Sequence, residues 1–281
     1  MTFSYLHIIP YFKVLVWYNY TMKKQANATG WGKVSRWYEK TVQDEKSTQQ
    51  EVILPSLVPI FKNLVKDKVV LDLGCGTGFF IHTLLMSGAK KVVAVDLDSE
   101  LLNVVKQKYQ NTDKVEIIQA DAEKLEGVAT GSVDMILSVE SLVNMRRLDK
   151  VTSEMRRVLS KDGKVLAVVN HPCFRVPQSS DWHFDIQGKK QGRVVYKYNT
   201  AHEVQIDMNP GSKINKKFTY TFHRSLAEYM KFFNKNRLAV VNISEIYSNK
   251  TSQAGALRKR EEDAARKEVP LFLIFELQKF S

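Results

Sequence analysis

From about residue 47 the pattern of apolar and polar positions along the chain becomes regular, and five predicted strands lie between residues 69 and 170. Five short, almost continuously apolar runs in this segment are typical of strands buried on both faces of a parallel sheet. These predicted strands cover residues 69–73, 91–95, 115–119, 133–138 and 164–169. Helical patterns cover residues 78–86, 99–109 and 148–159, and a turn is expected at 161–163. Alternating strands and helices predict βαβ units and a parallel sheet with helices on both faces.

The segments before and after residues 69–170 predict further elements. Thr48 and Glu51 are spaced as in a capping box, ahead of a helix expected to run to about residue 65. Residues 193–208 alternate like a β-hairpin around Asn199 and Thr200. They lie within a segment of different character, residues 171–224, which we interpret as an inserted, β-rich cap.

The α/β pattern returns after this insertion. Ser225 and Glu228 form a second predicted capping box, which opens a helix to about residue 234. Residues 238–246 and 271–278 predict two closing strands, and the charged stretch between them, including 258–267, is a helix or an exposed loop. The expected division is N-terminal helices at 22–66, an α/β domain at 67–170 and 225–281, and the cap at 171–224.

Composition agrees with a folded domain in a reducing compartment. The chain has 281 residues, of which 44% are hydrophobic, enough for one large domain or one domain with an insertion. The two cysteines, Cys75 and Cys173, show no pairing pattern, so we expect no disulfide framework and a cytoplasmic location.

Residues 1–21 are aromatic and apolar but are interrupted by His7, Pro10 and Lys13. The uninterrupted stretches are shorter than the roughly 20 residues that a membrane-spanning helix needs, and no small-residue cleavage site follows. We therefore expect no transmembrane span. Our hypothesis is that Met22 is the natural initiator and that residues 1–21 are a translated extension.

The positive charge of the chain is concentrated in one segment. The formal net charge is +12, and residues 186–260 hold fifteen Lys and Arg against four Asp and Glu. One interpretation is a solvated basic face. The other is a site for an anionic partner, such as a nucleic acid, a phosphate or a membrane surface.

The strongest chemical signal is a buried strand that leads into three glycines at alternate positions. Gly74, Gly76 and Gly78 would let the backbone turn tightly and let a ligand approach N–H groups near a helix N-terminus. The dinucleotide fingerprint needs a glycine where this chain has Phe79, and the Gly-Lys-Ser/Thr triplet of a P-loop is absent. An acid, Asp72, precedes the first glycine by two residues. It would repel a pyrophosphate but attract the ammonium and sulfonium groups of S-adenosylmethionine.

Two more acids end predicted strands. Asp96, 22 positions after Gly74, could accept hydrogen bonds from both hydroxyls of a ribose. Asp121 could accept one from an adenine amino group. With the glycine loop and the segments 131–134 and 157–163, they resemble the class I S-adenosylmethionine-dependent methyltransferases over about residues 69–170. This resemblance implies a Rossmann-like, doubly wound, mostly parallel seven-stranded sheet that ends in an antiparallel hairpin.

The resemblance also implies a cofactor, S-adenosyl-L-methionine, and roles for individual residues. Asp72 and the loop residues Gly74, Cys75, Gly76, Thr77 and Gly78 would surround its methionine moiety. Asp96 would hold the ribose, Leu97 would pack on the adenine, and Asp121 with Ala122 would face the adenine amino group. Ser138 and Val139 would border the sulfonium, and Tyr38 would close an N-terminal lid over the cofactor or simply pack that lid onto the core. No metal is expected.

The transfer resembles an in-line displacement on an already activated methyl group, so the protein mainly aligns the reactants and excludes water. A base is needed only if the acceptor must lose a proton. The candidate catalytic residues are Glu140, after the fourth strand, and His171, after the fifth; each could instead satisfy local backbone groups. Cys173 follows Pro172, like the nucleophile of some cytosine-C5 methyltransferases, but the rest of that pattern is missing and a plain thiol is the better interpretation.

Three functions compete. The leading hypothesis is methyl transfer to a small-molecule or lipid-like acceptor in a pocket under the cap. Segments 171–175 and 270–274, with the inserted hairpin, also resemble a bacterial subgroup of small-molecule-type enzymes, a resemblance that does not name a substrate. The second is an RNA or DNA methyltransferase that uses the basic 186–260 region. The third is a non-catalytic protein that uses the same fold for partner binding.

Overall fold

The computed structural model describes residues 31, 35–207, 218–253 and 255–280, and the side chains of 35–38, 256 and 257 lie outside this description. The expected extension at residues 1–21, with its hypothetical initiator Met22, also lies outside the described residues.

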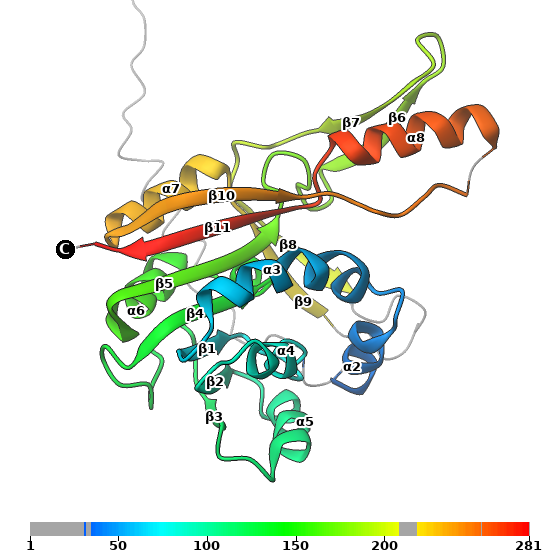
Figure 1. Cartoon of the computed structure of the whole chain (residues 1–281). Coiled ribbons are helices and arrows are strands. Elements are labelled where there is room, and N and C mark those ends of the chain that lie inside the picture. Colours follow the sequence, from blue (N-terminus) through cyan, green and yellow to red (C-terminus); the bar gives the residue numbers. More distant parts are fainter. Residues whose placement is uncertain (1–30, 32–34, 208–217, 254, 281) are drawn as a thin grey trace, which may run out of the picture.

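Seven strands form one sheet in the order β10-β11-β5-β4-β1-β2-β3. They are β1 (Val69–Leu73), β2 (Lys91–Asp96), β3 (Val115–Gln119), β4 (Val133–Val139), β5 (Leu159–Asn170), β10 (Leu238–Ile246) and β11 (Phe272–Lys279). The strands β1 to β5 pair in parallel, whereas β11 is antiparallel to both β5 and β10 (Figure 1). The expected doubly wound, mostly parallel seven-stranded sheet with a closing antiparallel hairpin is therefore confirmed.

Apolar helices cover both faces of this sheet because its buried strands point successive side chains to opposite sides. In β1, Leu71 and Leu73 join the cluster that holds α6 and α7, whereas Val70 joins the cluster that holds α3, α4 and α5. The helical elements are α2 (Ser35–Gln43), η2 (Gln49–Ile53), α3 (Leu54–Leu64), α4 (Ile81–Met86), α5 (Ser99–Tyr109), η3 (Leu142–Asn144), α6 (Leu148–Val158), α7 (Leu226–Lys235) and α8 (Ala256–Glu268).

Two predicted local structures differ in the first half of the chain. Thr48 has helical backbone angles and makes no capping bond, whereas the hydroxyl of Ser47 accepts the N–H of Gln50, and the turn that follows is the π-helical η2. The turn predicted at 161–163 is part of β5, which starts at Leu159. Pairing with β4 is irregular there, since Leu159 opposes Val133 and Lys164 opposes Met135.

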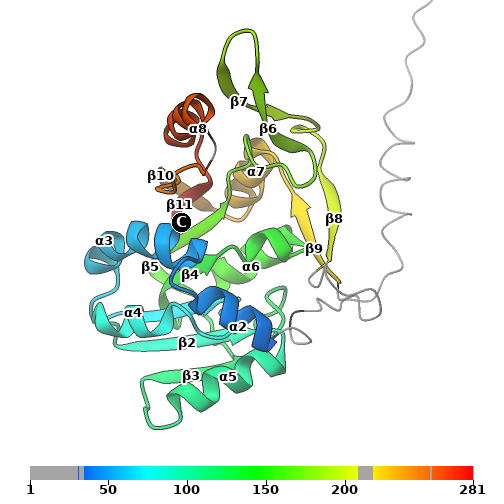
Figure 2. The same cartoon turned by 90° about the vertical axis from the view of Figure 1, so that its right-hand side faces the viewer.

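The cap consists of two antiparallel ribbons, β6 (Ser180–Asp185) with β7 (Lys190–Val195), and β8 (His202–Asp207) with β9 (Phe218–His223). The hairpin predicted over residues 193–208 is wrong, because β7 and β8 each pair with another strand. The alternation of apolar and polar side chains indicated strands in this segment, but which strands pair with each other depends on tertiary contacts. The second ribbon lies beside the sheet edge where the parallel strands end (Figure 2).

Downstream of the cap, the predicted capping box is confirmed, because the Ser225 hydroxyl accepts the Glu228 N–H and the Glu228 carboxylate accepts the Ser225 N–H. The charged stretch at 258–267 is helical and belongs to α8. Both cysteines are free thiols. Within the described residues, no helix is both long and apolar enough to cross a membrane.

An aromatic cluster fastens α7 to the closing hairpin. The ring of Phe275 in β11 is fully buried and lies 5.6 Å from the ring of Tyr229 and 5.2 Å from that of Phe233, measured between centroids.

We expect Phe275→Ala to lower the free energy of unfolding by about 3–5 kcal/mol, since it removes a large apolar side chain and leaves a cavity. Urea unfolding followed by circular dichroism measures this. The matched control Phe280→Ala, at a ring that is 41% exposed, should change it by less than about 0.5 kcal/mol; equal losses would contradict the assigned core.

Candidate active site

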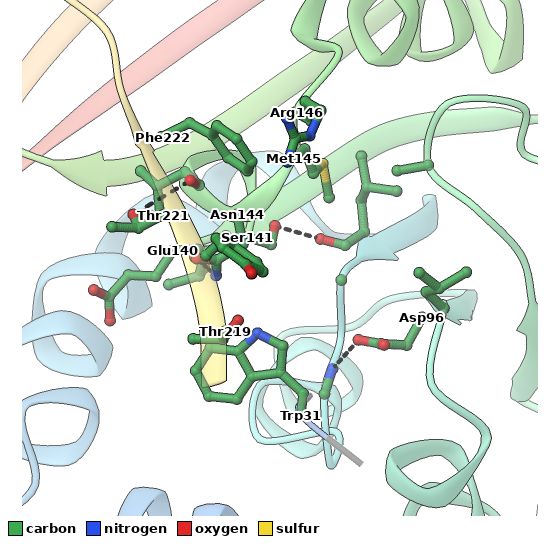
Figure 3. A pocket seen from close by; sticks show the side chains of 18 of the residues that line it. Trp31, Asp96, Glu140, Ser141, Asn144, Met145, Arg146, Thr219, Thr221 and Phe222 are labelled. Atoms are coloured by element: carbon green, nitrogen blue, oxygen red, sulfur yellow. Dashed lines mark hydrogen bonds between the residues drawn. The ribbon is translucent and has the colours of Figure 1, made fainter. Parts of the chain in front are cut away.

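A cavity of about 420 Å³ lies at the carboxyl ends of the parallel strands. This is where ligands bind in open α/β sheets, because the chain leaves β1 for one side of the sheet and β4 for the other. The lining residues come from the turns after β1, β2 and β3, from the loop after β4 with its η3, and from the cap strands β8 and β9. Figure 3 shows Asp96 on one side of the cavity and Thr219, Thr221 and Phe222 on the other. The lining residues that the sequence predicted are Gly74, Gly76, Asp96, Leu97, Asp121, Ala122, Val139 and Glu140.

The turn after β1 depends on the absence of a side chain at Gly74. Its φ is +73°, and a Cβ placed there would lie 2.5 Å from the Cβ of Ser141. The Ser141 hydroxyl donates to the Leu73 carbonyl at 2.7 Å and also bonds the hydroxyl of Ser138. The close approach of these two loops therefore defines the floor of the cavity. Gly78 serves packing instead, because a Cβ there would meet the side chains of Ile81 and Val105.

The glycine loop and the end of β2 are joined by one carboxylate. Asp96 Oδ2 accepts the Gly76 N–H at 2.9 Å, and Oδ1 accepts the Asp98 N–H at 3.0 Å. Burial raises the pKa of Asp96, and these backbone bonds oppose that shift. Asp98 in turn caps α5 by accepting the Glu100 N–H at 2.9 Å. Asp96 is thus held at the cavity wall by backbone donors from both sides.

Two polar side chains lie buried beneath the same loop. Asp72 is 2% exposed, and burial, followed by the nearby charge of Asp96, raises its pKa to about 7. Within the described part of the chain, Asp72 Oδ2 and Thr77 Oγ1 are buried without a hydrogen-bond partner. Burial also raises the pKa of the Cys75 thiol. Asp72, Cys75 and Thr77 therefore support the loop from below rather than line the cavity.

Glu140 lies at the opposite end of the cavity from Asp96. Its φ is +52°, an uncommon conformation for a residue with a side chain, and such strain is concentrated at functional sites. Its Oε2 accepts a bond from Gln49 Nε2 at 3.3 Å, and its carbonyl accepts one from Asn144 Nδ2 at 3.1 Å. Burial raises the Glu140 pKa to about 7, although the charge of Arg175 and the bond from Gln49 oppose the shift.

The cap ribbon is anchored to the loop after β4. The buried guanidinium of Arg224 donates to the carbonyls of Leu142, Met145 and Arg146. The ring of Phe222 lies between two guanidiniums, 5.2 Å from that of Arg146 and 5.5 Å from that of Arg224. The Thr221 hydroxyl donates to the Val143 carbonyl at 3.3 Å. These bonds hold β9 across the strand ends, so that its residues complete the cavity.

Other predicted residues lie elsewhere. Ser138 is fully buried behind the cavity wall, and His171 is 4% exposed, with Nδ1 accepting the Cys173 N–H and Nε2 bonded to Glu245 Oε1. Neither is among the lining residues, so His171 has no nitrogen directed at an acceptor in this structure. Cys173 is also outside the cavity lining. The side chain of Tyr38, in α2, lies outside the described residues.

Sequence reasoning missed the cap side of the cavity. The additional lining residues include Trp31, Gln49, Asn144, Arg146, Thr219, Tyr220, Thr221 and Phe222. The alternation of residues 218–223 indicates a strand, but only the folded ribbon shows that this strand faces the glycine loop.

Residues 71–167 match the family model described as a methyltransferase domain. A ubiquinone/menaquinone biosynthesis C-methyltransferase from Campylobacter jejuni is 35% identical over 106 residues, which cover 36% of this chain and 43% of that protein. A Haemophilus influenzae protein is 26% identical over 170 residues, 59% of this chain and 66% of its own length. The chain thus matches less than two thirds of the length of these curated relatives.

The S-adenosylmethionine-dependent methyltransferase from Mesorhizobium loti, a crystal structure, has the same fold, with a TM-score of 0.61 and 20% identity over 79% of this chain and 96% of that one. Residues 71–167 of this chain form a methyltransferase domain. The expected methyltransferase class is confirmed for this segment, and the expected Rossmann-like fold is that of an S-adenosylmethionine-dependent enzyme. The matched residues of the methyltransferase domain contain the glycine loop, Asp96, Asp121 and Glu140.

The contact between Gly74 and Ser141 predicts a difference between two glycines of the methyltransferase domain. Gly131 also has positive φ, but a Cβ there would meet nothing within 4 Å. Gly131→Ala should therefore cost about 1–2 kcal/mol of stability from backbone strain alone, whereas Gly74→Ala adds a steric clash and should cost clearly more. Urea unfolding of both variants measures the difference. Equal losses would show that the Ser141 contact does not constrain the turn.

Proposed function

We propose that this protein transfers a methyl group from S-adenosyl-L-methionine to a small-molecule acceptor bound between the strand ends and the β8–β9 ribbon. One observation carries the proposal: a single cavity of about 420 Å³ is bounded both by the glycine loop with Asp96 and by the cap strand β9. That volume lies in the range of small-molecule sites. A cofactor at the strand ends and an acceptor under the cap would therefore share one enclosure.

The residues around the glycine loop fit the cofactor. Asp72 and Thr77 lie beneath the glycine loop and outside the cavity lining, so the carboxylate of Asp72 would act on the cationic amino-acid end of the ligand through its charge rather than by direct contact. Asp96 would hold the ribose, and Leu97, Asp121 and Ala122 would border the adenine, because all four line the cavity on the β2 and β3 side. Val139 would border the sulfonium, while Ser138 would act from behind through its bond to Ser141.

The bound cofactor supplies an activated methyl group, so the protein has to orient the acceptor and exclude water. Glu140 is the best placed residue to hold or receive a proton, since it lines the cavity and has a pKa near 7. Thr219 also lines the cavity, and its buried Oγ1 has no partner among the described residues, which makes it a candidate acceptor contact. His171 is not used in this proposal.

The surroundings of the cap favour a small acceptor over a nucleic acid. Phe222, Val143 and Met145 give this end of the cavity an apolar surface. Several basic residues of the 186–260 segment serve internal contacts: Arg224 binds three carbonyls, and Arg193 binds the Phe174 carbonyl and Ser180. Part of the basic excess is therefore structural.

Incubation with methyl-labelled cofactor and separated cell fractions tests the proposal. We expect label in a small-molecule or lipid fraction, and no label with Asp96→Ala, which should lose cofactor binding. The matched control Asp113→Ala removes an exposed acid outside the cavity and should behave as wild type. Label confined to RNA or DNA would establish the nucleic-acid alternative. If calorimetry detects no cofactor binding to the folded protein, only the alternative of a non-catalytic, partner-binding protein remains.

Asp72 predicts a pH-dependent cofactor affinity. A cationic ligand group favours the ionised carboxylate, and its pKa is about 7 in the folded protein, so affinity should rise with pH through about 7 relative to Asp72→Asn. Because folding raises this pKa from 3.8 to about 7, ligand-free wild type should lose stability relative to Asp72→Asn as pH rises between these two values, and no further above about 7. Calorimetry and urea unfolding at matched pH values measure the two effects. Parallel pH profiles for the two proteins would refute the role.

Glu140→Gln tests the proton-holding role once a labelled product is available. If Glu140 acts as the base, wild-type rates should rise with pH through about 7, whereas Glu140→Gln should be slower by about 100-fold or more and lack that step. Its cofactor affinity should be unchanged. Glu126→Gln, at an exposed residue outside the cavity, is the control. An unaltered pH profile in Glu140→Gln would remove this role.

A further inference from the structure

A second, smaller cavity of about 160 Å³ lies between η2, the β6–β7 ribbon and α8. Figure 1 shows α8 beside β6 and β7 at one end of the molecule, beyond the sheet strands that carry the glycine loop. The second cavity is lined by Thr48, Val52, Arg175, Trp182, Ser248, Lys250, Arg266, Val269 and Leu271. It shares no lining residue with the main cavity.

Among the residues that the structure describes, the lining of this cavity carries three cations and no carboxylate. Lys250 is paired with Glu51 at 3.1 Å. Arg266 approaches Glu262 only to 4.0 Å, and that carboxylate already accepts bonds from Arg258 and Ser252. Arg266 Nε is buried without a hydrogen-bond partner within the residues that the structure describes. Two cations contributed by different parts of the chain therefore converge on a space with little compensating charge.

Arg175 is the third cation that lines this cavity. Among the described residues, no hydrogen bond from its side chain and no ion pair within 4.0 Å is found. Burial lowers the Arg175 pKa, although the charge of Glu140 opposes the shift. Burial, and then the charge of Arg175, lower the pKa of Arg193, although the charge of Asp181 opposes the shift. The guanidinium of Arg193 lies 5.3 Å from the centre of the Trp182 ring. A fourth cation thus stands next to the cavity wall, and positive charge is concentrated there.

We propose that this cavity binds an oxyanion, a phosphate or a carboxylate, either free or carried by a small organic molecule. Guanidinium groups match the geometry of these anions through paired N–H donors. The hydroxyls of Thr48 and Ser248 add two further donors to the lining, and Trp182, Val269 and Leu271 provide an apolar wall for an attached organic group. The site goes beyond methyl transfer, since neither Arg175 nor Arg266 lines the main cavity.

Calorimetry of the full chain with inorganic phosphate, at constant ionic strength, tests the site. We expect saturable binding to wild type. Arg266→Gln should weaken it at least about tenfold, equivalent to about 1.4 kcal/mol. Arg258→Gln is the matched control, because Arg258 lies on the same helix and binds the same Glu262 but does not line the cavity. It should leave the phosphate affinity within about twofold of wild type.

A second variant, Arg175→Gln, should weaken phosphate binding as Arg266→Gln does. Cofactor affinity, measured on the same samples, shows that each protein is folded and keeps this test separate from that of methyl transfer. Absence of saturable binding to wild type, or equal effects of Arg258→Gln and Arg266→Gln, would overturn the proposal. Calorimetry with phenyl phosphate and with acetate identifies the kind of anion that the cavity binds. Tighter binding of phenyl phosphate than of inorganic phosphate indicates an organic ligand whose apolar part lies on Trp182, and equal binding of the two indicates a free ion. Tighter binding of acetate than of phosphate indicates a carboxylate.

Discussion

The close packing of Gly74 against Ser141 is the constraint on which the candidate active site depends. Because β1 and β4 are parallel neighbours, the turns that follow them leave the sheet at the same edge. Only a residue without a Cβ allows these turns to touch, and the Ser141 hydroxyl then bonds the Leu73 carbonyl. This contact positions both ends of the cavity. The glycine loop holds Asp96 through the Gly76 N–H on one side, and Glu140, with its positive φ, immediately precedes Ser141 on the other.

Burial of carboxylates at this edge links stability to function. Asp72 and Glu140 both have pKa values near 7 because they lie in surroundings of low polarity, and the ionised form of each is correspondingly costly. Two apolar clusters, one on each face of the sheet, supply the stability that offsets this cost. The cap adds enclosure rather than new carboxylates. Arg224 ties β9 to the loop after β4, and the threonines of β9 then face the strand ends.

The basic side chains of segment 186–260 are neighbours in the sequence but lie in different parts of the fold. As a count of charges it is one feature, consistent with a nucleic-acid surface. In the fold, Arg224 is buried under the cap, Arg193 binds carbonyl and hydroxyl oxygens beside Trp182, and Lys250 reaches the second cavity. The N–H donors that these arginines give to carbonyl and hydroxyl oxygens are not available to bind a nucleic-acid phosphate directly. The small cavity instead gathers Arg175, which precedes the segment, and Arg266, which follows it.

The sequence by itself determined the sheet and the glycine-loop side of the candidate site. Apolar runs and helical periodicity are local properties, and the glycines, Asp96 and Asp121 follow strands whose parallel order brings their ends together. Strand partners in the cap, the true capping residue Ser47 and the exclusion of His171 from the cavity were decided only by tertiary structure. Which strand pairs with which, and whether a side chain faces a cavity or a neighbouring residue, depends on contacts between segments far apart in the chain. No local pattern encodes those contacts, so the acceptor side of the cavity and the arginine-lined cavity emerged only from the folded chain.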